Sequence, residues 1–456
     1  MDDGLNSASS IGARVRAADL SAELIMRAHV ERIRGDDCNA FLHEDGERAI
    51  SRARRLDRDI SVGKPTGPLA GVPISVKDVI AVAGMPLTMG SIAFANNIAR
   101  RSAAAVERLE AAGAIVVGKT NCPEFAFGTT CESPLGGTTL NPVHPLRSVG
   151  GSSGGDAAAV ASGLSILGLG TDYGGSLRWP AACVGMVALR PTAHGVDGRG
   201  QVPGIAGRVD GDAWPSPLKL QGAMQTVGLI ARSVEDLTLS WSVLRSAPPG
   251  LRAPDGLRVA WTEGTHIGPV RAEFANAVAA AAQFLDPGAR HVPGALADTL
   301  DAYNELRALD PLDDHLAAVA GREGQLAQPT RALLRAQRTP PVEKLSAAWA
   351  QALDIRARAI DLFDHADILI LPVAGGPACD MQGYVDVDGT TVGGWQLMAH
   401  CRAVTLTGCP AVSVPVGEGS DGLPIAVQVV AAPGRDDVAL RAAAQLDGKR
   451  VVGVRH

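Results

Sequence analysis

Alternating helical and extended patterns along the chain predict an α/β protein. In residues 20–60, apolar side chains recur every three or four positions with charged residues between them, which is typical of amphipathic helices. Asp19 or Ser21 is expected to cap the first of these helices. The β-branched run in residues 68–83 predicts a strand, and residues 102–120 read as a helix followed by a second strand.

The same alternation continues in the second half of the chain. Helical spacing predicts helices in five further segments, 234–245, 273–284, 296–319, 395–406 and 436–446, and on both sides of the Pro340–Pro341 break within 330–363. Short apolar runs predict strands at 256–262, 366–372, 411–416 and 424–431. Strands and helices that alternate in this way favour one α/β core with helices on both faces of a sheet.

The chain of 456 residues is long enough for one large core. We expect a single domain over residues 1–456. Residues 60–240 would form the core with the chemistry-bearing motifs, and residues 245–360 a helical insertion that covers the site. Residues 361–456 would complete the sheet with strands and a closing helix.

The most informative stretch is residues 150–191, which holds two glycine-flanked serine clusters joined by a small-residue helical run. Ser152 and Ser153 lie in the first cluster and Ser176 in the second. Glycine has no Cβ, so backbone N–H groups approach a ligand closely, and a helix that begins nearby adds the positive end of its dipole. One such loop could be a plain surface turn, but two in this order favour a nucleophile with an oxyanion site.

Two lysines lie inside apolar runs. Lys77 is either a surface lysine on an edge strand or a buried amine, whose pKa burial would lower until it acts as a base. Lys119 belongs to a literal match to the P-loop pattern at residues 113–120, but the middle residues Ala-Ile-Val-Val predict a strand and no helix begins at Lys119. We therefore reject a nucleotide site.

Composition and charge exclude several classes of function. The net charge is −6 with no basic block, and only 4% of residues are aromatic, which argues against nucleic-acid binding. No apolar run is long enough to predict a membrane span. The seven cysteines show neither CxxC nor zinc spacing, and no secretory signal is expected, so we predict reduced thiols, no metal and a cytoplasmic location.

Three segments, PLAGVPISVKD, GGSSGGDAAAVASG and GTDYGGSLRWPA, resemble the amidase signature family. The resemblance spans about residues 20–446 and is weakest between about 245 and 360. It implies a single large α/β/α sandwich with a central mixed, mostly parallel twisted sheet. Three positions depart from the family pattern. The family usually has a lysine where this chain has Arg190, a proline where it has Val149, and a small residue where it has Asp156.

The resemblance also implies a catalytic triad without a cofactor. Ser176 would be the nucleophile, Ser152 would bridge it to Lys77, and a cis peptide bond would join Gly151 to Ser152. The chemistry is consistent, because serine needs a neighbour that takes its proton and a hydroxyl both donates and accepts. Lysine has an ordinary pKa near ~10.4, so Lys77 must be buried to act as the base at neutral pH.

Backbone N–H groups on the second loop would stabilise the oxyanion. The resemblance assigns this role to Tyr173, Gly174, Gly175 and Ser176, and a supporting role to Gly151, Ser153, Asp172 and Arg178. Asp172 and Arg178 would pair and brace the loop, while the alternative for Arg178 is a clamp on a substrate carboxylate. We expect the pocket walls to come from residues 122–131, 193–217 and 374–396 and from the middle insertion.

These observations favour a hydrolase that cleaves a small-molecule amide through an acyl-enzyme, with no nucleic-acid partner and a homodimer as one option. The alternative is the glutaminase subunit of a tRNA-dependent amidotransferase, which the divergent loop at 203–217 weakens. A third option is a catalytically inactive scaffold, against which an intact Lys77, Ser152 and Ser176 argue.

Overall fold

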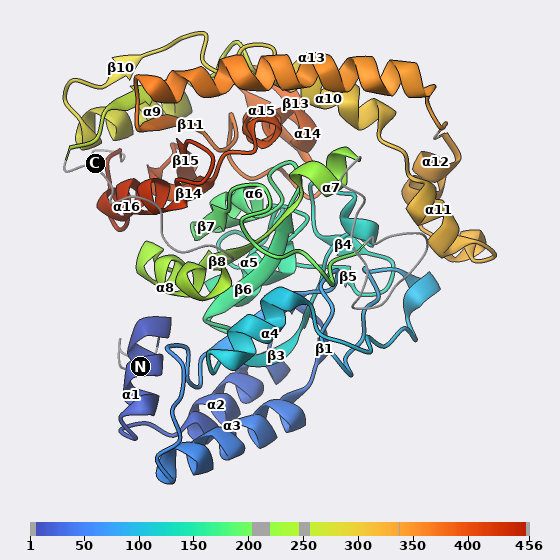
Figure 1. Ribbon diagram of the computed structural model, residues 1–456, viewed down its shortest axis with the longest axis vertical. Coiled ribbons are helices and arrows are strands. Elements are labelled where there is room, and N and C mark those ends of the chain that lie inside the picture. Colours follow the sequence, from blue (N-terminus) through green and yellow to red (C-terminus); the bar gives the residue numbers. More distant parts are fainter. Residues whose placement is uncertain (1–5, 203–218, 246–255, 337, 453–456) are drawn as a thin grey trace.

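A mixed sheet of 11 strands forms the centre of the molecule (Figure 1). The computed structural model describes residues 6–202, 219–245, 256–336 and 338–452. Across the sheet the strands follow the order β1 (Phe41–Glu44), β3 (Ile115–Thr120), β2 (Pro73–Lys77), β6 (Leu167–Asp172), β8 (Thr226–Ala231), β7 (Val187–Arg190), β14 (Ala411–Glu418), β15 (Pro424–Ala431), β11 (Ile368–Pro372), β9 (Val259–Trp261) and β10 (Arg290–His291).

Parallel pairs lie in two groups, one on each flank of the sheet. Strand β2 is parallel to β3 and β6, and β9 is parallel to β11 and β10. The pairs between these groups, from β6 to β11, are antiparallel, as is the edge pair of β1 with β3. Strands β9 and β10, which fall within the segment 245–360, extend the sheet at its far edge.

Helices cover both faces of this sheet, as the sequence predicts. Every residue of β6, β7 and β8 is buried, and successive side chains of a strand point to opposite faces, so both faces are covered. The first half of the chain supplies α1 (Ala8–Arg16), α2 (Ala22–Arg34), α3 (Gly46–Ser61), α4 (Ala104–Ala111), α5 (Gly154–Ala161), α6 (Arg178–Cys183), α7 (Leu220–Met224) and α8 (Val234–Leu244). The fold class is therefore an α/β/α sandwich around a mixed sheet.

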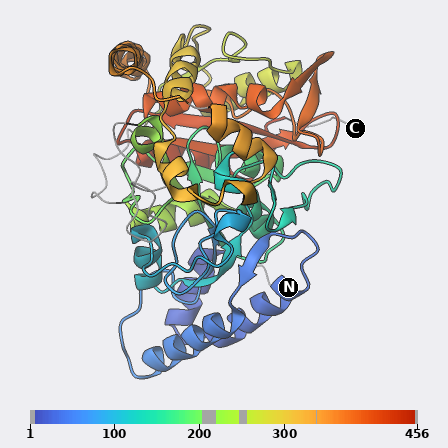
Figure 2. The ribbon, with the colours of Figure 1, turned by 90° about the vertical axis from the view of Figure 1, so that its right-hand side faces the viewer.

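The second half adds helices on and around the far end of the sheet. They are α9 (Ala272–Leu285), α10 (Thr299–Leu309), α11 (Asp313–Val319), α12 (Gln328–Ala336), α13 (Val342–Ile360), α14 (Gly394–Leu397), α15 (Ala399–Thr407) and α16 (Asp436–Leu446). Helices α10, α13 and α15 pack on one another. Helices α2 and α3 lie at one end of the molecule and the long α13 at the other (Figures 1 and 2).

Most predicted elements are present within a few residues of their expected bounds. Ser21, one of the two expected caps, accepts a hydrogen bond from the N–H of Leu24 at the start of α2. The stretch 20–60 also contains the edge strand β1, which helical spacing does not predict. Within the described ranges, no helix combines the length and the apolar character needed to cross a bilayer.

Lys119 is part of a structural ion pair. Lys119 lies on β3 and is fully buried. Its Nζ donates to Oδ1 of Asp78 at 2.9 Å and to the carbonyl of Pro86 at 3.0 Å. The residues 115–120 form a strand rather than a phosphate-binding loop. The rejection of a nucleotide site at this motif is consistent with this arrangement.

Lys119→Met is therefore expected to destabilise the fold. It leaves the buried carboxylate of Asp78 without its cation, a loss that typically costs about 3–5 kcal/mol. Urea denaturation measures the free energy of unfolding. Lys64→Met is the matched control, because the Lys64–Asp59 pair is exposed and water screens such pairs, so they contribute little to stability. Equal stability of both variants would contradict a structural role for Lys119.

Candidate active site

A fully buried lysine amine is the centre of the site. Lys77 ends β2, a strand in which all five residues are buried. Its Nζ donates to Oγ of Ser152 at 2.7 Å and to Oγ1 of Thr171 at 3.1 Å. Of the two alternatives that the sequence leaves open for Lys77, the buried amine is therefore the correct one.

Burial lowers the pKa of Lys77, because a charged amine is poorly solvated in the interior. The carboxylates of Asp156 and Asp172 act in the opposite direction without overcoming this effect. Within the described part of the chain, Lys77 forms no ion pair, since both of its hydrogen-bond partners are hydroxyls. A neutral amine is thus favoured at a lower pH than for an exposed lysine.

Ser152 lies just before α5 and is buried against Lys77. The cis peptide bond expected between Gly151 and Ser152 is present. A side chain at Gly151 would lie 2.4 Å from the carbonyl oxygen of Thr130, so only glycine fits there. The position of the Ser152 hydroxyl is therefore determined by a closely packed loop.

Ser176 lies on the second glycine loop and is partly exposed in the same pocket as Ser152. The two loops are joined by a hydrogen bond from the N–H of Ser153 to the carbonyl of Ser176 at 3.0 Å. Among the contacts of the described residues there is no hydrogen bond between the hydroxyls of Ser152 and Ser176. The structure thus brings Lys77 and Ser152 into direct contact and places Ser176 beside them.

The carboxylate of Asp172 holds the second loop together. It accepts hydrogen bonds from the N–H groups of Gly175 at 2.8 Å and Leu177 at 3.2 Å, and from Nε and Nη2 of Arg178 at 3.0 and 2.9 Å. Burial alone would raise the pKa of Asp172, but Arg178 and Arg190 lower it to about 2. The carboxylate therefore stays ionised and braces the loop.

The contacts of Arg178 favour the bracing role over the alternative of a clamp on a substrate carboxylate. Its side chain is fully buried and donates to Asp172, to Oε1 of Gln428 at 2.8 Å and to Oγ1 of Thr405 at 3.0 Å. A guanidinium held in this way does not line the pocket that contains the two serines.

The four predicted oxyanion donors differ in their hydrogen bonding. The N–H groups of Tyr173, Gly174 and Ser176 meet no acceptor among the described residues, whereas that of Gly175 already donates to Asp172. The prediction for Gly175 is corrected on this ground. Gly175 has instead a conformational role. Its φ of +117° favours glycine, and a Cβ at this position would lie only 2.7 Å from Cβ of Cys401.

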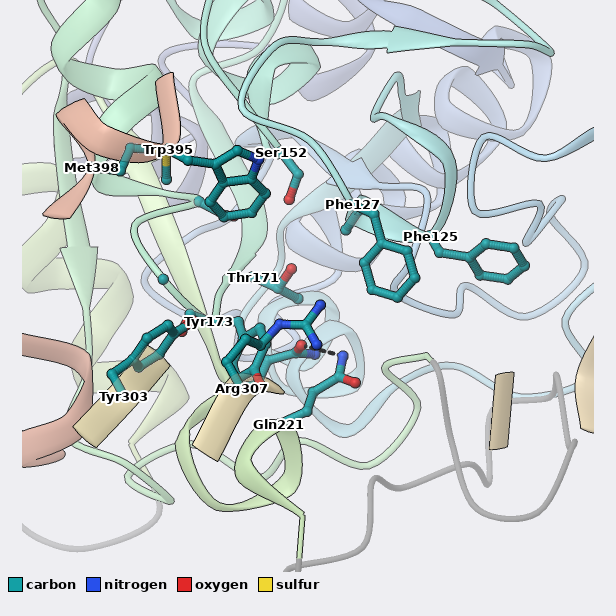
Figure 3. A pocket seen from close by; sticks show the side chains of 14 residues that line it. Phe125, Phe127, Ser152, Thr171, Tyr173, Gln221, Tyr303, Arg307, Trp395 and Met398 are labelled. Atoms are coloured by element: carbon teal, nitrogen blue, oxygen red, sulfur yellow. Dashed lines mark hydrogen bonds between the residues drawn. The ribbon is translucent and has the colours of Figure 1, made fainter. Parts of the chain in front are cut away.

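The pocket around the two serines is narrow and has one cationic side chain (Figure 3). Phe127 and Trp395 come from two of the predicted wall segments, and Tyr303 and Arg307 come from α10 in the middle insertion. Gln221, which follows the predicted segment 193–217, also lines the pocket, and residues 203–217 lie outside the described part of the structure.

Sequence reasoning missed two groups of the site. Thr171 precedes Asp172 in the quoted GTDYGGS stretch, so its closeness to the nucleophile loop was the available signal. Arg307 lies on an alanine-rich helix where the family resemblance is weakest, so nothing in the sequence singles it out. Within the described ranges, no cluster of three or more His, Cys, Asp or Glu side chains could hold a metal ion.

Comparison with known proteins identifies close similarity to one family. The chain matches the amidase family model over residues 25–253 and 313–440. It is 44% identical over 188 residues to the A-type subunit of glutamyl-tRNA(Gln) amidotransferase from Lachnospira eligens, covering 41% of this chain and 39% of that protein. The corresponding subunit from Carboxydothermus hydrogenoformans is 29% identical over 486 residues, with 96% of each chain covered.

Solved structures show the same similarity over the whole fold. The 6-aminohexanoate cyclic dimer hydrolase superimposes with a TM-score of 0.82 at 28% identity, covering 98% of this chain and 97% of that one. A second structure, described as an amidase, gives a TM-score of 0.85 at 27% identity and covers 96% of this chain and 99% of its own.

Asp156 is a buried carboxyl group behind Lys77, at a position where a small residue is common in the family that the sequence resembles. Its Oδ1 accepts hydrogen bonds from Oγ of Ser75 at 2.9 Å and Oγ1 of Thr120 at 3.0 Å. Its Oδ2 is buried and has no partner among the described residues. Burial raises the pKa of Asp156 to about 7, so its ionisation opposes folding.

Asp156→Asn is expected to stabilise the protein more at pH 8 than at pH 5. Between pH 4 and 7 the folded wild type holds a proton that the unfolded chain has lost, so its stability falls as the pH rises through this window. Asparagine does not ionise and escapes this fall, which gives a difference on the order of 2 kcal/mol between the two pH values. Urea denaturation at both pH values measures it.

Asp361→Asn provides the control, because it makes the same substitution at an exposed position instead of a buried one. A stability change for Asp156→Asn that is the same at pH 5 and pH 8 would contradict the raised pKa.

Proposed function

This chain belongs to the amidase signature family, and we propose that it hydrolyses the amide bond of a small-molecule substrate by a Ser-Ser-Lys mechanism. The observation that carries the proposal is the hydrogen bond of 2.7 Å between Nζ of the buried Lys77 and Oγ of Ser152. A buried amine with a lowered pKa accepts a proton at a pH where an exposed lysine cannot.

In the first half-reaction, Oγ of Ser176 attacks the carbonyl carbon of the amide. Its proton passes to Oγ of Ser152, whose own proton passes to Nζ of Lys77. The hydrogen bond of Lys77 to Thr171 holds the amine in place beside Ser152. The negative charge that develops on the carbonyl oxygen is stabilised by the free N–H groups of the second loop, each of which typically contributes roughly 10²–10³-fold in rate.

Collapse of the tetrahedral intermediate breaks the carbon–nitrogen bond. The leaving nitrogen takes the proton back along Lys77 and Ser152, which releases ammonia or an amine and leaves an ester on Ser176. Water then attacks the ester, again giving its proton to the relay, and the acid product and free serine result. The Asp172–Arg178 pair keeps the loop of Ser176 in place through both halves.

A second candidate is the glutaminase subunit of a tRNA-dependent amidotransferase. It is favoured by the curated relatives, which are A-type subunits of glutamyl-tRNA(Gln) amidotransferase, one of them aligned over 96% of both chains. The chain spans only 39% of the length of the relatives in Lachnospira eligens and Acidothermus cellulolyticus. The two candidates share the triad and differ in substrate and in the need for partner chains.

Purification distinguishes the two candidates. The chain isolated alone is expected to release ammonia or an amine from members of a panel of primary amides, anilides and carbamoyl compounds. Activity restricted to glutamine, together with stoichiometric partner chains that co-purify from the native cells, would favour the amidotransferase subunit instead.

The proposed mechanism predicts that a fluorophosphonate probe labels Ser176 with loss of fluoride. Ser176→Ala should abolish both labelling and hydrolysis, because the attacking oxygen is gone. Lys77→Ala should lower kcat/KM at neutral pH by about 10²–10⁴-fold, because the proton acceptor is gone. Labelling is read by intact mass and hydrolysis by ammonia release.

Ser162→Ala serves as the matched control and should label like the wild type, since Ser162 caps the far end of α5. Full activity of Lys77→Ala at neutral pH would count against the relay. Absence of labelling in the wild type would favour an inactive scaffold.

A further inference from the structure

Arg307 occupies the junction of two pockets. It lines the narrow pocket that contains Ser152 and Ser176 and also the adjoining pocket of about 480 Å³, which is wide enough for the body of a small molecule. Figure 3 shows its guanidinium extending into the space below Ser152 and Thr171. A substrate whose carbonyl group lies at the serines could therefore place a second functional group at this guanidinium.

The guanidinium of Arg307 lies over two aromatic rings. Its carbon lies 5.7 Å from the ring centroid of Phe127 and 5.6 Å from that of Tyr173. Such contacts orient the planar cation while its N–H groups remain available in the plane. Tyr173 is itself held, because its hydroxyl donates to Oδ2 of Asp310 at 3.0 Å. The guanidinium is thus preorganised.

Among the described residues, no carboxylate forms a hydrogen bond with Arg307. In the described part of the chain it forms neither a hydrogen bond nor an ion pair, and no acidic side chain lines either pocket. Asp310, on the next turn, attracts the guanidinium electrostatically without a hydrogen bond to it. Its carboxylate accepts hydrogen bonds from Tyr173 and from the N–H groups of Leu220 and Gln221. Arg178 differs from Arg307 in this respect. It is fully buried, donates its hydrogen bonds to protein acceptors and does not line the pocket.

A second arginine increases the positive potential of the outer pocket. Arg402 lines it and donates to Oδ1 of Asn304 at 2.6 Å and to the carbonyl of Trp395 at 2.7 Å. These acceptors are neutral, so they do not cancel its charge. A partly dehydrated pocket whose described lining has two cations and no acidic side chain attracts a negatively charged ligand.

We propose that Arg307 binds a carboxylate of the substrate, so that the preferred substrates are amides that also carry an acidic group. The planar guanidinium with free N–H groups matches the geometry of a carboxylate, which accepts two parallel hydrogen bonds. This inference rests on the proposed function and specifies its substrate class. It makes Arg307 a binding residue and assigns it no part in the proton relay.

The test measures binding to the Ser176→Ala variant by calorimetry, so that ligands stay intact. The ligands are ω-carboxy primary amides of increasing chain length, each paired with the uncharged alkanamide of the same length. At least one acid is expected to bind roughly 10- to 100-fold more tightly than its uncharged counterpart, as for a hydrogen-bonded charge. Arg307→Met added to Ser176→Ala should remove this preference, and Arg307→Lys should restore part of it.

Arg335→Met is the matched control. It also removes one positive charge, but Arg335 is exposed on α12 and does not line the pocket. It should leave the preference for the acid unchanged. Equal binding of acids and uncharged amides, or a preference that survives Arg307→Met, would overturn the inference. Fluorophosphonate labelling of the wild type reports separately on the proposed function, so tight acid binding without labelling would reject the mechanism and retain the carboxylate site.

Discussion

The site depends on keeping one lysine amine inside the protein without a carboxylate partner. Two buried lysines lie on the neighbouring strands β2 and β3, where Lys77 pairs with Thr120 and Lys119 with Val76 in the register. Lys119 has a carboxylate at 2.9 Å, whereas Lys77 contacts two hydroxyls. The same residue type thus serves as a structural cation on one strand and as a candidate base on the next, because the partners differ.

The surrounding fold supports this arrangement in layers. Lys77 lies at the end of β2, Ser152 in the loop before α5, and Ser176 in the loop after β6. The Asp172–Arg178 pair ties that loop to the far strands through Gln428 on β15. Buried charges therefore hold this loop in place. The N–H groups of Tyr173, Gly174 and Ser176, which meet no acceptor among the described residues, belong to residues that line the pocket.

Sequence patterns predicted the α/β class and most helices, because amphipathic spacing survives in segments that are half exposed. They missed the central strands β6 and β8. In β6 the run Leu-Gly-Leu-Gly lacks the β-branched residues that mark a strand, whereas β8 contains such residues and was missed all the same. The motif resemblance located Lys77, Ser152 and Ser176 beforehand. It could not show that the Gly175 N–H is already occupied or that Arg307 reaches the pocket, because both depend on tertiary contacts.

The central claim is that the Lys77 amine loses its proton more readily than an ordinary lysine. With only six lysines in the chain, labelling with lysine enriched in ¹³C at Cε allows each amine to be titrated by NMR. The signal of Lys77 is identified by its absence in Lys77→Arg. A midpoint below the 10.5 of an unperturbed lysine is the predicted result. A midpoint at or above that value would contradict the account.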